Sequence, residues 1–494
     1  MLPLYSKPAE LEKLAKEKYA VPQFLMMENA AKAMADFILK KASGRSDGGS
    51  QSSIAIVCGK GNNGGDGYAL ARLLQDKLKV TVIALEAPAA EEATVQYKMC
   101  TKLGIKILKT KKFPALTHED FIVDCIYGTG FHGELSPEIK KIIKQMNASP
   151  SIKIACDIPS GLAFQTDYTI TMGSNKLALF SDKAKAVCGE IITADLGIAR
   201  ERFEGLLKPE AYLIQNEDLI LPLRKDRAAH KGTYGHTAVL CGDKAGASIL
   251  CASAAMNFGS GLTTIIKNTA ALSHFKISPS LMLSDSLPAR TSCLALGSGF
   301  SEFSDTAAET LVSFFQKIYS SQSSQASRPA QGPAAVLDAG MLTSPKTPQL
   351  LKNLNRFENA RIILTPHLGE LSGLLKNCKA KGDISVTALA DCPESKIAAG
   401  LFLNKLFPRT TVIMKSANTF IACQGKIYIV ADGCPSLAKG GSGDILAGLT
   451  AALLAQGYSA KDAAITAAGY HASLSKKLGN QAYNLTPEKL LKII

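Results

Sequence analysis

Short hydrophobic runs alternate along the whole chain with segments of helical periodicity. The runs of the first half cover 53–59, 79–85, 121–128 and 152–161, and those of the second half cover 237–243, 262–267, 292–299, 334–340, 361–367, 411–417 and 419–430. Most are continuously apolar, as strands are when both faces of a parallel sheet are covered by helices. The pattern therefore predicts an α/β fold in both halves.

Several of these runs end in a turn that contains glycine, aspartate or asparagine. In open parallel sheets, ligands bind at the carboxyl ends of the strands. We therefore expect the functional sites of both halves at these turns.

The chain has 494 residues, more than one hydrophobic core usually supports. A fresh strand-turn-helix pattern begins after 217–227, so we expect an N-terminal domain at 1–216, a linker at 217–227 and a C-terminal domain at 228–494. The stretches 43–53 and 320–334 are rich in Ser, Gly and Gln. This composition predicts surface loops.

Composition narrows the class of protein. No segment approaches the roughly 18 apolar residues of a membrane-spanning helix, and the N-terminus has no signal-peptide core, so we expect a cytoplasmic protein that binds no membrane. The 12 cysteines include no C-x-x-C pair and are expected to be buried thiols. The formal charge of +14 is spread along the chain without interleaved aromatic residues, which argues against nucleic-acid binding.

Three loops of the first half carry candidate chemistry: GKGNNGGDG at 59–67, DCIYGTGFHGEL at 124–135 and CDIPSGL at 156–162. Their glycines allow backbone N–H groups to approach a phosphate or ribose. Asn63, Asp124 and Ser160 offer oxygen atoms that could share one hard cation. Each alone has a simpler interpretation, since Asp124 could cap a turn and Ser160 a helix.

One segment of the second half, LAKGGSGDILAGLTAALLAQG at 437–457, joins a glycine-rich turn to a helix with Asp444 in its first turn. A helix N-terminus stabilises charge that develops on a transferred phosphoryl group, and the carboxylate can accept the proton of the attacking hydroxyl. The alternative is a capped helix whose aspartate only favours the helix dipole.

The motifs MMENAA (26–31), GNNGGDGYALAR (61–72), VDCIYGTGFHG (123–133) and DIPSG (157–161) together resemble the NAD(P)H-hydrate epimerase domain over about the first 210 residues. The resemblance implies a Rossmann-like three-layer α/β/α domain that interconverts the R and S forms of hydrated NAD(P)H. It implies a potassium ion at Asn63, Asp124 and Ser160, and it leaves open which carboxylate moves the proton, with Asp157 our choice. The residues implied to bind the dinucleotide are Asn62, Asn63, Gly64, Gly65, Asp66, Gly128, Thr129, Gly130, Phe131, His132, Gly133, Glu134 and Asp157.

The second half resembles the ribokinase-like superfamily, and within it the ADP- or ATP-dependent NAD(P)H-hydrate dehydratases. The resemblance rests on 437–457 together with the motifs at 230–255, 294–300, 336–342, 364–371 and 414–422. It implies a ribokinase-like α/β domain that uses ADP or ATP and Mg²⁺, with Asp444 catalytic. The implied nucleotide-binding residues are Lys415, Ser416, Ala417, Asn418, Thr419 and Gly443, and those facing the hydrate are Ala247, Gly299, His367 and Asp444.

Three departures from the dehydratase pattern are visible. Ser442 stands where the family usually has threonine, the glycine-rich patch at 242–246 is short, and a second acid is missing near Gly340. Serine can replace the threonine hydroxyl. The missing acid is expected to alter nucleotide or magnesium binding.

The leading hypothesis is a bifunctional repair enzyme, assembled as a homo-oligomer, in which the epimerase supplies the S-specific dehydratase with substrate. One alternative is a ribokinase-like small-molecule kinase fused to a nucleotide-binding module. Another is an N-terminal domain that recognises a nucleotide or RNA end without catalysis.

Overall fold

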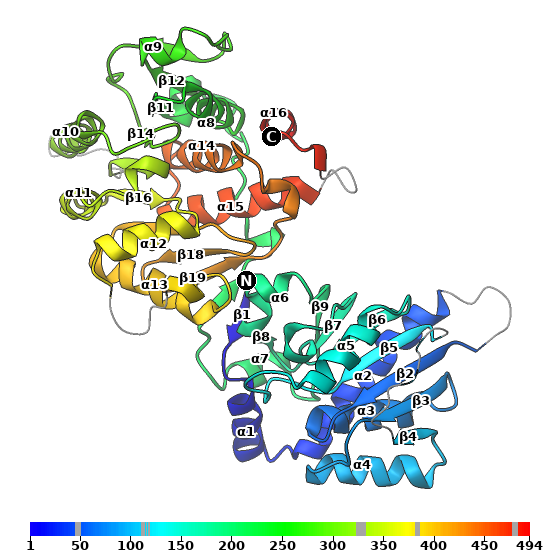
Figure 1. The fold of residues 1–494 in the computed structure, drawn as a ribbon. Coiled ribbons are helices and arrows are strands. Elements are labelled where there is room, and N and C mark those ends of the chain that lie inside the picture. The colour runs from blue at the N-terminus through cyan, green and yellow to red at the C-terminus, as the bar shows by residue number, and fades with distance from the viewer. Residues whose placement is uncertain are drawn as a thin grey trace. The chain divides into compact units, whose positions relative to one another are not determined.

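The computed structural model describes residues 1–44, 51–109, 114, 116, 119–322, 332–380, 386–476 and 483–494. It contains two compact units, one formed by 3–210 and the other by 1–2 with 211–494 (Figure 1). The central parts of the loops expected at 43–53 and 320–334 lie outside the described residues. Within the described ranges, no helix is long and apolar enough to cross a bilayer.

The N-terminal unit is built on a parallel sheet with the strand order β4-β3-β2-β5-β6-β7-β9. The order reverses direction between β2 and β5, which places a topological switch point at their carboxyl ends. A short parallel pair, β1 with β8, lies outside this sheet. The elements are β1 (Leu2–Tyr5), α1 (Pro8–Tyr19), α2 (Gln23–Ser43), β2 (Ser53–Cys58), α3 (Asn62–Leu74), β3 (Lys79–Ala84), α4 (Glu91–Lys102), β4 (Ile107–Lys109), β5 (Phe121–Cys125), α5 (Pro137–Asn147), β6 (Ile152–Cys156), β7 (Tyr168–Met172), β8 (Asn175–Lys176), α6 (Asp182–Lys185), β9 (Glu190–Ala194) and α7 (Arg200–Glu204).

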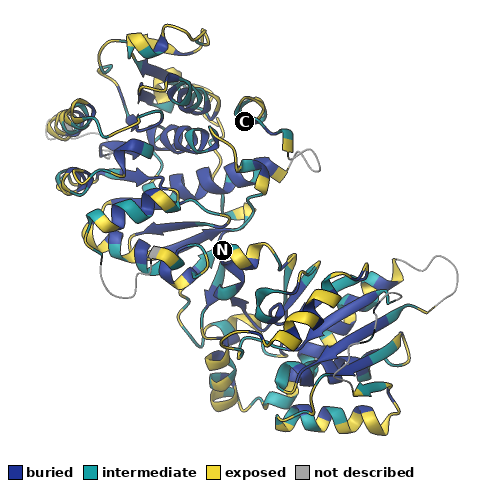
Figure 2. Cartoon of the chain, in the orientation of Figure 1, coloured by how far each residue is buried: buried dark blue, intermediate teal, exposed yellow. Residues whose placement is uncertain are grey.

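Helices cover both faces of this sheet, and the alternation of side chains along β2 shows how. Ile54 and Ile56 pack into the cluster formed with α2 and α3. Ala55 and Val57 point to the opposite face and pack with α5. Both sets are fully buried, so the strands form the dark central layer of Figure 2.

The C-terminal unit has a mixed sheet with the strand order β13-β12-β11-β14-β15-β16-β17-β18-β19-β10. Pairing is parallel except at β17-β18 and β18-β19. The elements are β10 (Ala211–Leu213), β11 (His236–Leu240), α8 (Ala245–Asn257), β12 (Leu262–Ile266), α9 (Thr269–Leu272), β13 (Met282–Ser284), β14 (Cys293–Leu296), α10 (Asp305–Gln322), β15 (Ala334–Leu337), α11 (Thr347–Leu354), β16 (Arg361–Leu364), α12 (Leu368–Asn377), α13 (Pro393–Leu406), β17 (Thr410–Met414), β18 (Thr419–Cys423), β19 (Lys426–Val430), α14 (Ser442–Ala455), α15 (Ala460–Lys476) and α16 (Pro487–Ile493).

Helices α8, α14 and α15 pack on one face of this sheet, and α10 to α13 lie on the other (Figure 1). Helix α14 is buried from Ile445 to Ala455, as expected of a helix that is apolar on all sides. Its N-terminus, which carries Asp444, is held at the carboxyl ends of the strands by this packing. The α/β architecture expected for both halves is confirmed.

The apolar run at 419–430 is not a strand of the predicted parallel type. It forms the antiparallel hairpin β18-β19, which turns at Gln424 (φ 50°) and Gly425 (φ 72°). Two consecutive residues with positive φ form the tight turn that matches the twist of a two-stranded ribbon. The cysteines behave as expected, since each of the twelve is a free thiol and most are buried.

Candidate functional sites

The three glycine-rich loops of the N-terminal unit meet at the switch point between β2 and β5. They line a cavity of about 500 Å³, here called the switch-point cavity. The residues expected at the dinucleotide that line it are Asn62, Asn63, Asp66, Gly128, Thr129, Gly130, Phe131 and Asp157. Gly133 and Glu134 instead line a separate hollow beside α5, and among the described lining residues His132 belongs to neither.

Glycine is required beneath this cavity because the backbones approach one another closely. A Cβ at Gly64 would lie 2.1 Å from the carbonyl oxygen of Gly59, and one at Gly65 would lie 3.1 Å from the Cα of Ala93. Gly61, the N-cap residue of α3, has no side chain to occupy the first N–H groups of that helix. These groups remain available for an anion.

Asp157 lies directly after β6 with φ 72°, a conformation uncommon for a residue with a side chain. Its Oδ2 accepts a hydrogen bond from the Thr129 N–H at 2.9 Å. A Cβ at Gly128 would lie 2.7 Å from the same oxygen and 3.3 Å from Asn63 Oδ1. The three loops are therefore in direct contact around this carboxylate.

A buried lysine neutralises Asp157. Lys176 of β8 is 2% exposed and forms an ion pair with the Asp157 carboxylate. Burial lowers the pKa of Lys176 to about 8, while the nearby carboxylates of Glu12 and Asp66 act in the opposite direction.

Asp66 and Glu12 complete a cluster of ionisable groups with Lys176 and Asp157, here called the acid–lysine cluster. Burial raises the pKa of Asp66 well above its usual value, and the Glu12 carboxylate raises it further. Burial also raises the pKa of Glu12. Sequence reasoning missed Lys176 and Glu12, because neither lies in a glycine-rich loop.

Asp124 and Ser160 are in contact as expected, and both are fully buried. Ser160 donates to Asp124 from its hydroxyl (2.7 Å, to Oδ1) and from its backbone N–H (2.8 Å, to Oδ2). Burial raises the pKa of Asp124 to about 6, against the lowering effect of these hydrogen bonds. Asn63 lies beside the intervening loop at Gly128, and its buried Nδ2 makes no hydrogen bond in the described part of the chain.

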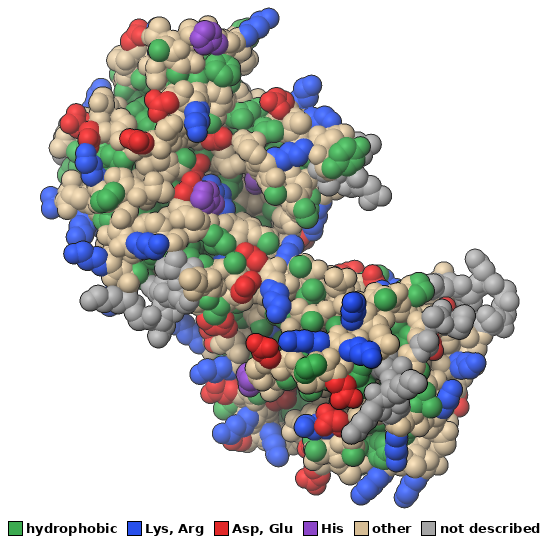
Figure 3. All heavy atoms as spheres, in the orientation of Figure 1, with side chains coloured by type: hydrophobic (Ala, Val, Ile, Leu, Met, Phe, Trp, Pro, Cys, Tyr) green, Lys and Arg blue, Asp and Glu red, His purple; other side chains and the backbone are tan. Residues whose placement is uncertain are grey.

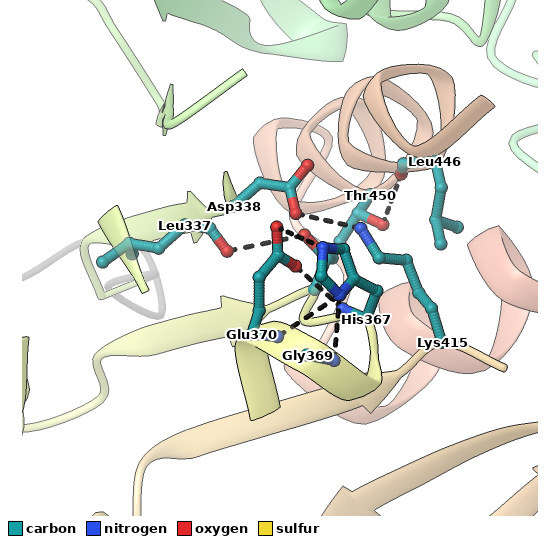
Figure 4. Close-up of polar contacts among 9 residues, drawn as sticks. Leu337, Asp338, His367, Gly369, Glu370, Lys415, Leu446 and Thr450 are labelled. Atoms are coloured by element: carbon teal, nitrogen blue, oxygen red, sulfur yellow. Dashed lines mark hydrogen bonds and ion pairs between the residues drawn. The ribbon is translucent and has the colours of Figure 1, made fainter. Parts of the chain in front are cut away.

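In the C-terminal unit, strand ends bring one lysine and several acids together. Lys415 follows β17, and Asp338 follows β15. The Nζ of Lys415 donates to Asp338 Oδ1 at 3.1 Å (Figure 4). Glu370, in the first turn of α12, points its carboxylate toward the same region. Figure 3 shows acidic and histidine side chains gathered at a hollow on the face of this unit.

The charges at this site act on one another. Burial and the neighbouring Asp338 raise the pKa of Asp444 to about 6, and burial raises that of Glu370. Burial lowers the pKa of Lys415, but Asp338 and Glu370 outweigh it and raise the pKa above its usual value. Lys415 therefore carries its proton, and Asp444 is largely ionised at neutral pH.

The acid that the sequence comparison found missing near Gly340 has counterparts in space. Asp338 stands two residues before Gly340 and is 4% exposed, and Glu370 comes from the next strand-to-helix turn. The site therefore contains three carboxylates. The sequence did not single out Glu370, because an acid three residues after the N-cap residue His367 is typical of a helix-capping box.

His367 caps helix α12. Its Nδ1 accepts hydrogen bonds from the N–H groups of Gly369 (3.0 Å) and Glu370 (3.2 Å). Its Nε2 lies 3.2 Å from Glu370 Oε1. The ring is 61% exposed, so its Nε2 edge remains accessible to a ligand.

The other residues expected at this site lie on an adjoining loop and in the first turns of α8 and α14. A Cβ at Gly299 would contact Ala247 Cβ at 3.3 Å, and one at Gly443 would contact Lys415 Nζ at 3.1 Å. Ser442 Oγ lies 3.2 Å from Nε2 of the buried His471. Asp444 thus lies in the first turn of α14, and the absence of a side chain at Gly443 leaves space for Lys415 Nζ beside that turn.

The loop 415–419, expected to hold the nucleotide, is braced by a second lysine. Lys396 of α13 is fully buried and donates from Nζ to Ser416 Oγ at 2.7 Å. Ser416 Oγ donates in turn to the Asn418 carbonyl at 2.6 Å. Lys396 stands in a helix outside every motif, so sequence reasoning did not find it.

Two sequence families match this chain. Residues 24–178 match the family described as YjeF-related protein N-terminus, and 237–494 match the family described as NAD(P)H-hydrate dehydratase. Proteins called bifunctional NAD(P)H-hydrate repair enzyme Nnr are similar to it. The one from Helicobacter pylori is 34% identical over 100% of this chain and 99% of its own, and the one from Coxiella burnetii is 30% identical over 92% and 90%.

Solved structures also match. One is an ADP/ATP-dependent NAD(P)H-hydrate dehydratase from Bacillus subtilis co-crystallised with ATP and Mg²⁺. It is 23% identical, and the match covers 55% of this chain and 91% of that one with a TM-score of 0.42.

The fold and the family matches together define an α/β enzyme of nucleotide metabolism that is built from two units. The chain belongs to the family of bifunctional NAD(P)H-hydrate repair enzymes. It is accordingly both an epimerase and a dehydratase of hydrated nicotinamide nucleotides, and the alternative of a small-molecule kinase joined to a binding module is not supported.

Proposed function

We propose that the switch-point cavity carries out the epimerisation and that the Lys415–Asp338 region carries out the dehydration. The observation that carries the first assignment is the acid–lysine cluster. Its three carboxyl groups line a cavity of about 500 Å³ at the switch point, where such sheets bind nucleotides, and the buried ammonium of Lys176 pairs with one of them.

The epimerisation inverts the carbon of the nicotinamide ring that carries the added hydroxyl. Its C–O bond must break with a proton delivered to the oxygen, and water must add to the other face with a proton removed. Asp157 is our assignment for the group that moves these protons, because its carboxyl group lines the cavity and is held in place by Lys176 and by the Thr129 N–H. Asp66, whose pKa burial raises well above its usual value, supplies a second carboxyl group at the cavity for proton exchange.

We assign the potassium site to Asp124, Ser160 and Asn63. Asp124 and Ser160 offer buried oxygens, and within the described residues no lysine or arginine forms an ion pair with Asp124. An oxygen-only donor set suits a hard cation. Asp124, Ser160 and Asn63 all contact the loop 126–128, so an ion held by them would supply positive charge beside that loop.

In the dehydration, Asp444 accepts the proton of the ring hydroxyl as that oxygen takes a phosphoryl group from ADP or ATP. Loss of phosphate from that carbon, together with a proton from the neighbouring ring carbon, then forms the double bond of the dihydronicotinamide. Lys415 and the N-terminus of α14 stabilise the charge on the transferred group. Residues Lys415 to Thr419 and Gly443 would hold the nucleotide, and Ala247, Gly299 and His367 would face the hydrate.

Magnesium would accompany the nucleotide and neutralise charge on its phosphates. The described residues hold no preformed cluster of three His, Cys, Asp or Glu ligands. The ion would therefore take most of its ligands from phosphate and water, as magnesium commonly does. Asp338 and Glu370 are the carboxylates that act most strongly on Lys415, and they would complete the coordination of the magnesium ion.

We further propose that the functional domains extend over 1–216 and 228–494 with a linker at 217–227, because both family matches fall inside these limits. A cytoplasmic location and a homo-oligomer are part of the same proposal. Both follow from the kinship with metabolite repair enzymes.

Two matched variants test whether epimerisation and dehydration take place at separate sites. Asp157→Asn should stop interconversion of the R and S hydrates while dehydration of the S hydrate continues, and Asp444→Asn should do the reverse. Each activity is followed by chromatography of the two hydrates and by the absorbance of the recovered dinucleotide. Loss of both activities in either variant would contradict the assignment.

A further inference from the structure

A second cavity lies in the N-terminal unit at the carboxyl end of β3, here called the β3 cavity. Its volume is about 320 Å³, and its lining residues are Ala84, Leu85, Glu86, Ala87, Pro88, Tyr97 and Lys109. Lys109 Nζ lies 5.4 Å from the centre of the Tyr97 ring. The cavity thus offers an aromatic ring, apolar walls, one acid and one base, which is the composition of a nucleoside site.

The position of Glu86, just after the end of β3, indicates which ligand this cavity binds. Strand β3 pairs with β2, the strand that leads into the first glycine-rich loop. In dinucleotide-binding sheets, an acid at the end of this neighbouring strand, about 20 residues after the glycines, binds the ribose hydroxyls of the adenosine half. Glu86 occupies this position relative to Gly65.

The β3 cavity adjoins the switch-point cavity. Lys60, which lines the switch-point cavity, contacts Glu86 at 3.5 Å between Nζ and Oε2. The Ala89 N–H donates to the Lys60 carbonyl at 2.8 Å, so the loop after β3 runs alongside the loop after β2. Glu86 is also close to Tyr127 of the switch-point cavity, whose pKa rises through burial and through this carboxylate.

We propose that the β3 cavity binds the adenosine half of the hydrated dinucleotide, with the Glu86 carboxylate accepting hydrogen bonds from the ribose 2′ and 3′ hydroxyls. This inference rests on the proposed epimerase function of the switch-point cavity. The nicotinamide half then lies at Asp157, and the diphosphate lies at the N-terminus of α3. The adenine ring packs between Tyr97 and Pro88.

This arrangement makes Glu86 a specificity residue. A carboxylate binds a ribose diol well but repels a 2′-phosphate, so the epimerase should prefer the hydrate of NADH over that of NADPH. Lys60 contacts Glu86 and Lys109 lines the same cavity, so both would attract the 2′-phosphate once the carboxylate charge is gone. The preference therefore depends on a single side chain.

The test compares Glu86→Gln with the wild-type chain in the epimerase assay, with the two hydrates as separate substrates. Glu86 is 46% exposed, so the substitution should leave the fold intact. Loss of a hydrogen bond to a charged group should lower kcat/KM for the NADH hydrate about 10-fold or more. The value for the NADPH hydrate should stay equal or rise, and Glu91→Gln, on the exposed start of α4, should change neither.

A second readout uses fragments that lack the nicotinamide. ADP-ribose should inhibit wild-type epimerisation more strongly than 2′-phospho-ADP-ribose, and Glu86→Gln should reverse or abolish this order. An unchanged ratio of the two hydrates in Glu86→Gln, or equal inhibition of the wild type by both fragments, would overturn the proposal. Failure of the epimerase assignment itself would look different, because neither hydrate would then be epimerised by any variant.

Discussion

The buried ion pair between Lys176 and Asp157 joins the two-residue strand β8 to the turn after β6. The proposed epimerase site includes this pair. Lys176 is 2% exposed and Asp157 is 7% exposed, so each group requires the other to remain charged. The pair holds an ionised carboxylate against the switch-point cavity.

Replacing Lys176 by methionine should damage both stability and epimerisation. Removing one partner leaves a buried charge uncompensated, at a cost of about 3 to 5 kcal/mol to the free energy of unfolding. The first unfolding transition should therefore move to lower temperature, and epimerisation should fall while dehydration of the S hydrate continues. Lys183→Met, at an exposed position of α6, is the matched control and should leave both transition and activities unchanged.

Potassium should stabilise the N-terminal unit through Asp124. An ion that binds only the folded state raises the unfolding temperature with its concentration, so potassium chloride should raise it more than choline chloride does at equal ionic strength. In Asp124→Asn this difference should disappear, whereas Asp76→Asn, at an exposed position after α3, should retain it. Equal effects of the two salts on the wild type would refute the potassium site.

His471 should make the C-terminal unit sensitive to acid. Burial, helped by the nearby Lys415, lowers its pKa in the folded state to about 4, whereas an unfolded histidine titrates near 6.5. The folded state therefore binds the proton less readily. Stability is fully present above about pH 6.5 and is lost as the pH falls toward 4, by about 3 kcal/mol from this group.

The measurement is the unfolding temperature between pH 4 and 8 for the wild type and for His471→Gln. The variant should be less stable at pH 8, because it loses the contact to Ser442, but its stability should decline less on acidification. Parallel pH profiles would show that His471 does not titrate as described.

Much of the fold could be predicted from local patterns. Continuous apolar runs such as 53–59 and 334–340 are strands of the two sheets, because a strand covered on both faces has no polar side to break the run. The hairpin at 419–430 was missed for the same reason, since both of its strands are apolar and only Gln424 and Gly425 separate them.

The loops of both sites could likewise be located, because glycine and strand-end acids mark the places where a parallel sheet binds ligands. Lys176 could not, since its strand has only two residues and no local pattern shows that it pairs with Asp157. Glu12 comes from a helix whose pattern is that of a solvated surface. Such groups become functional only through tertiary packing, which no local pattern records.

The central claim is that one chain repairs both epimers of the hydrate, each unit performing one step. The most direct measurement supplies the wild-type chain with an equal mixture of R and S hydrates of NADH, together with ADP or ATP and Mg²⁺, and follows the recovery of NADH absorbance. We predict complete recovery by the wild type and recovery of only the S half by Asp157→Asn. Wild-type recovery that stops at the S half, or no recovery of either epimer, would contradict the account.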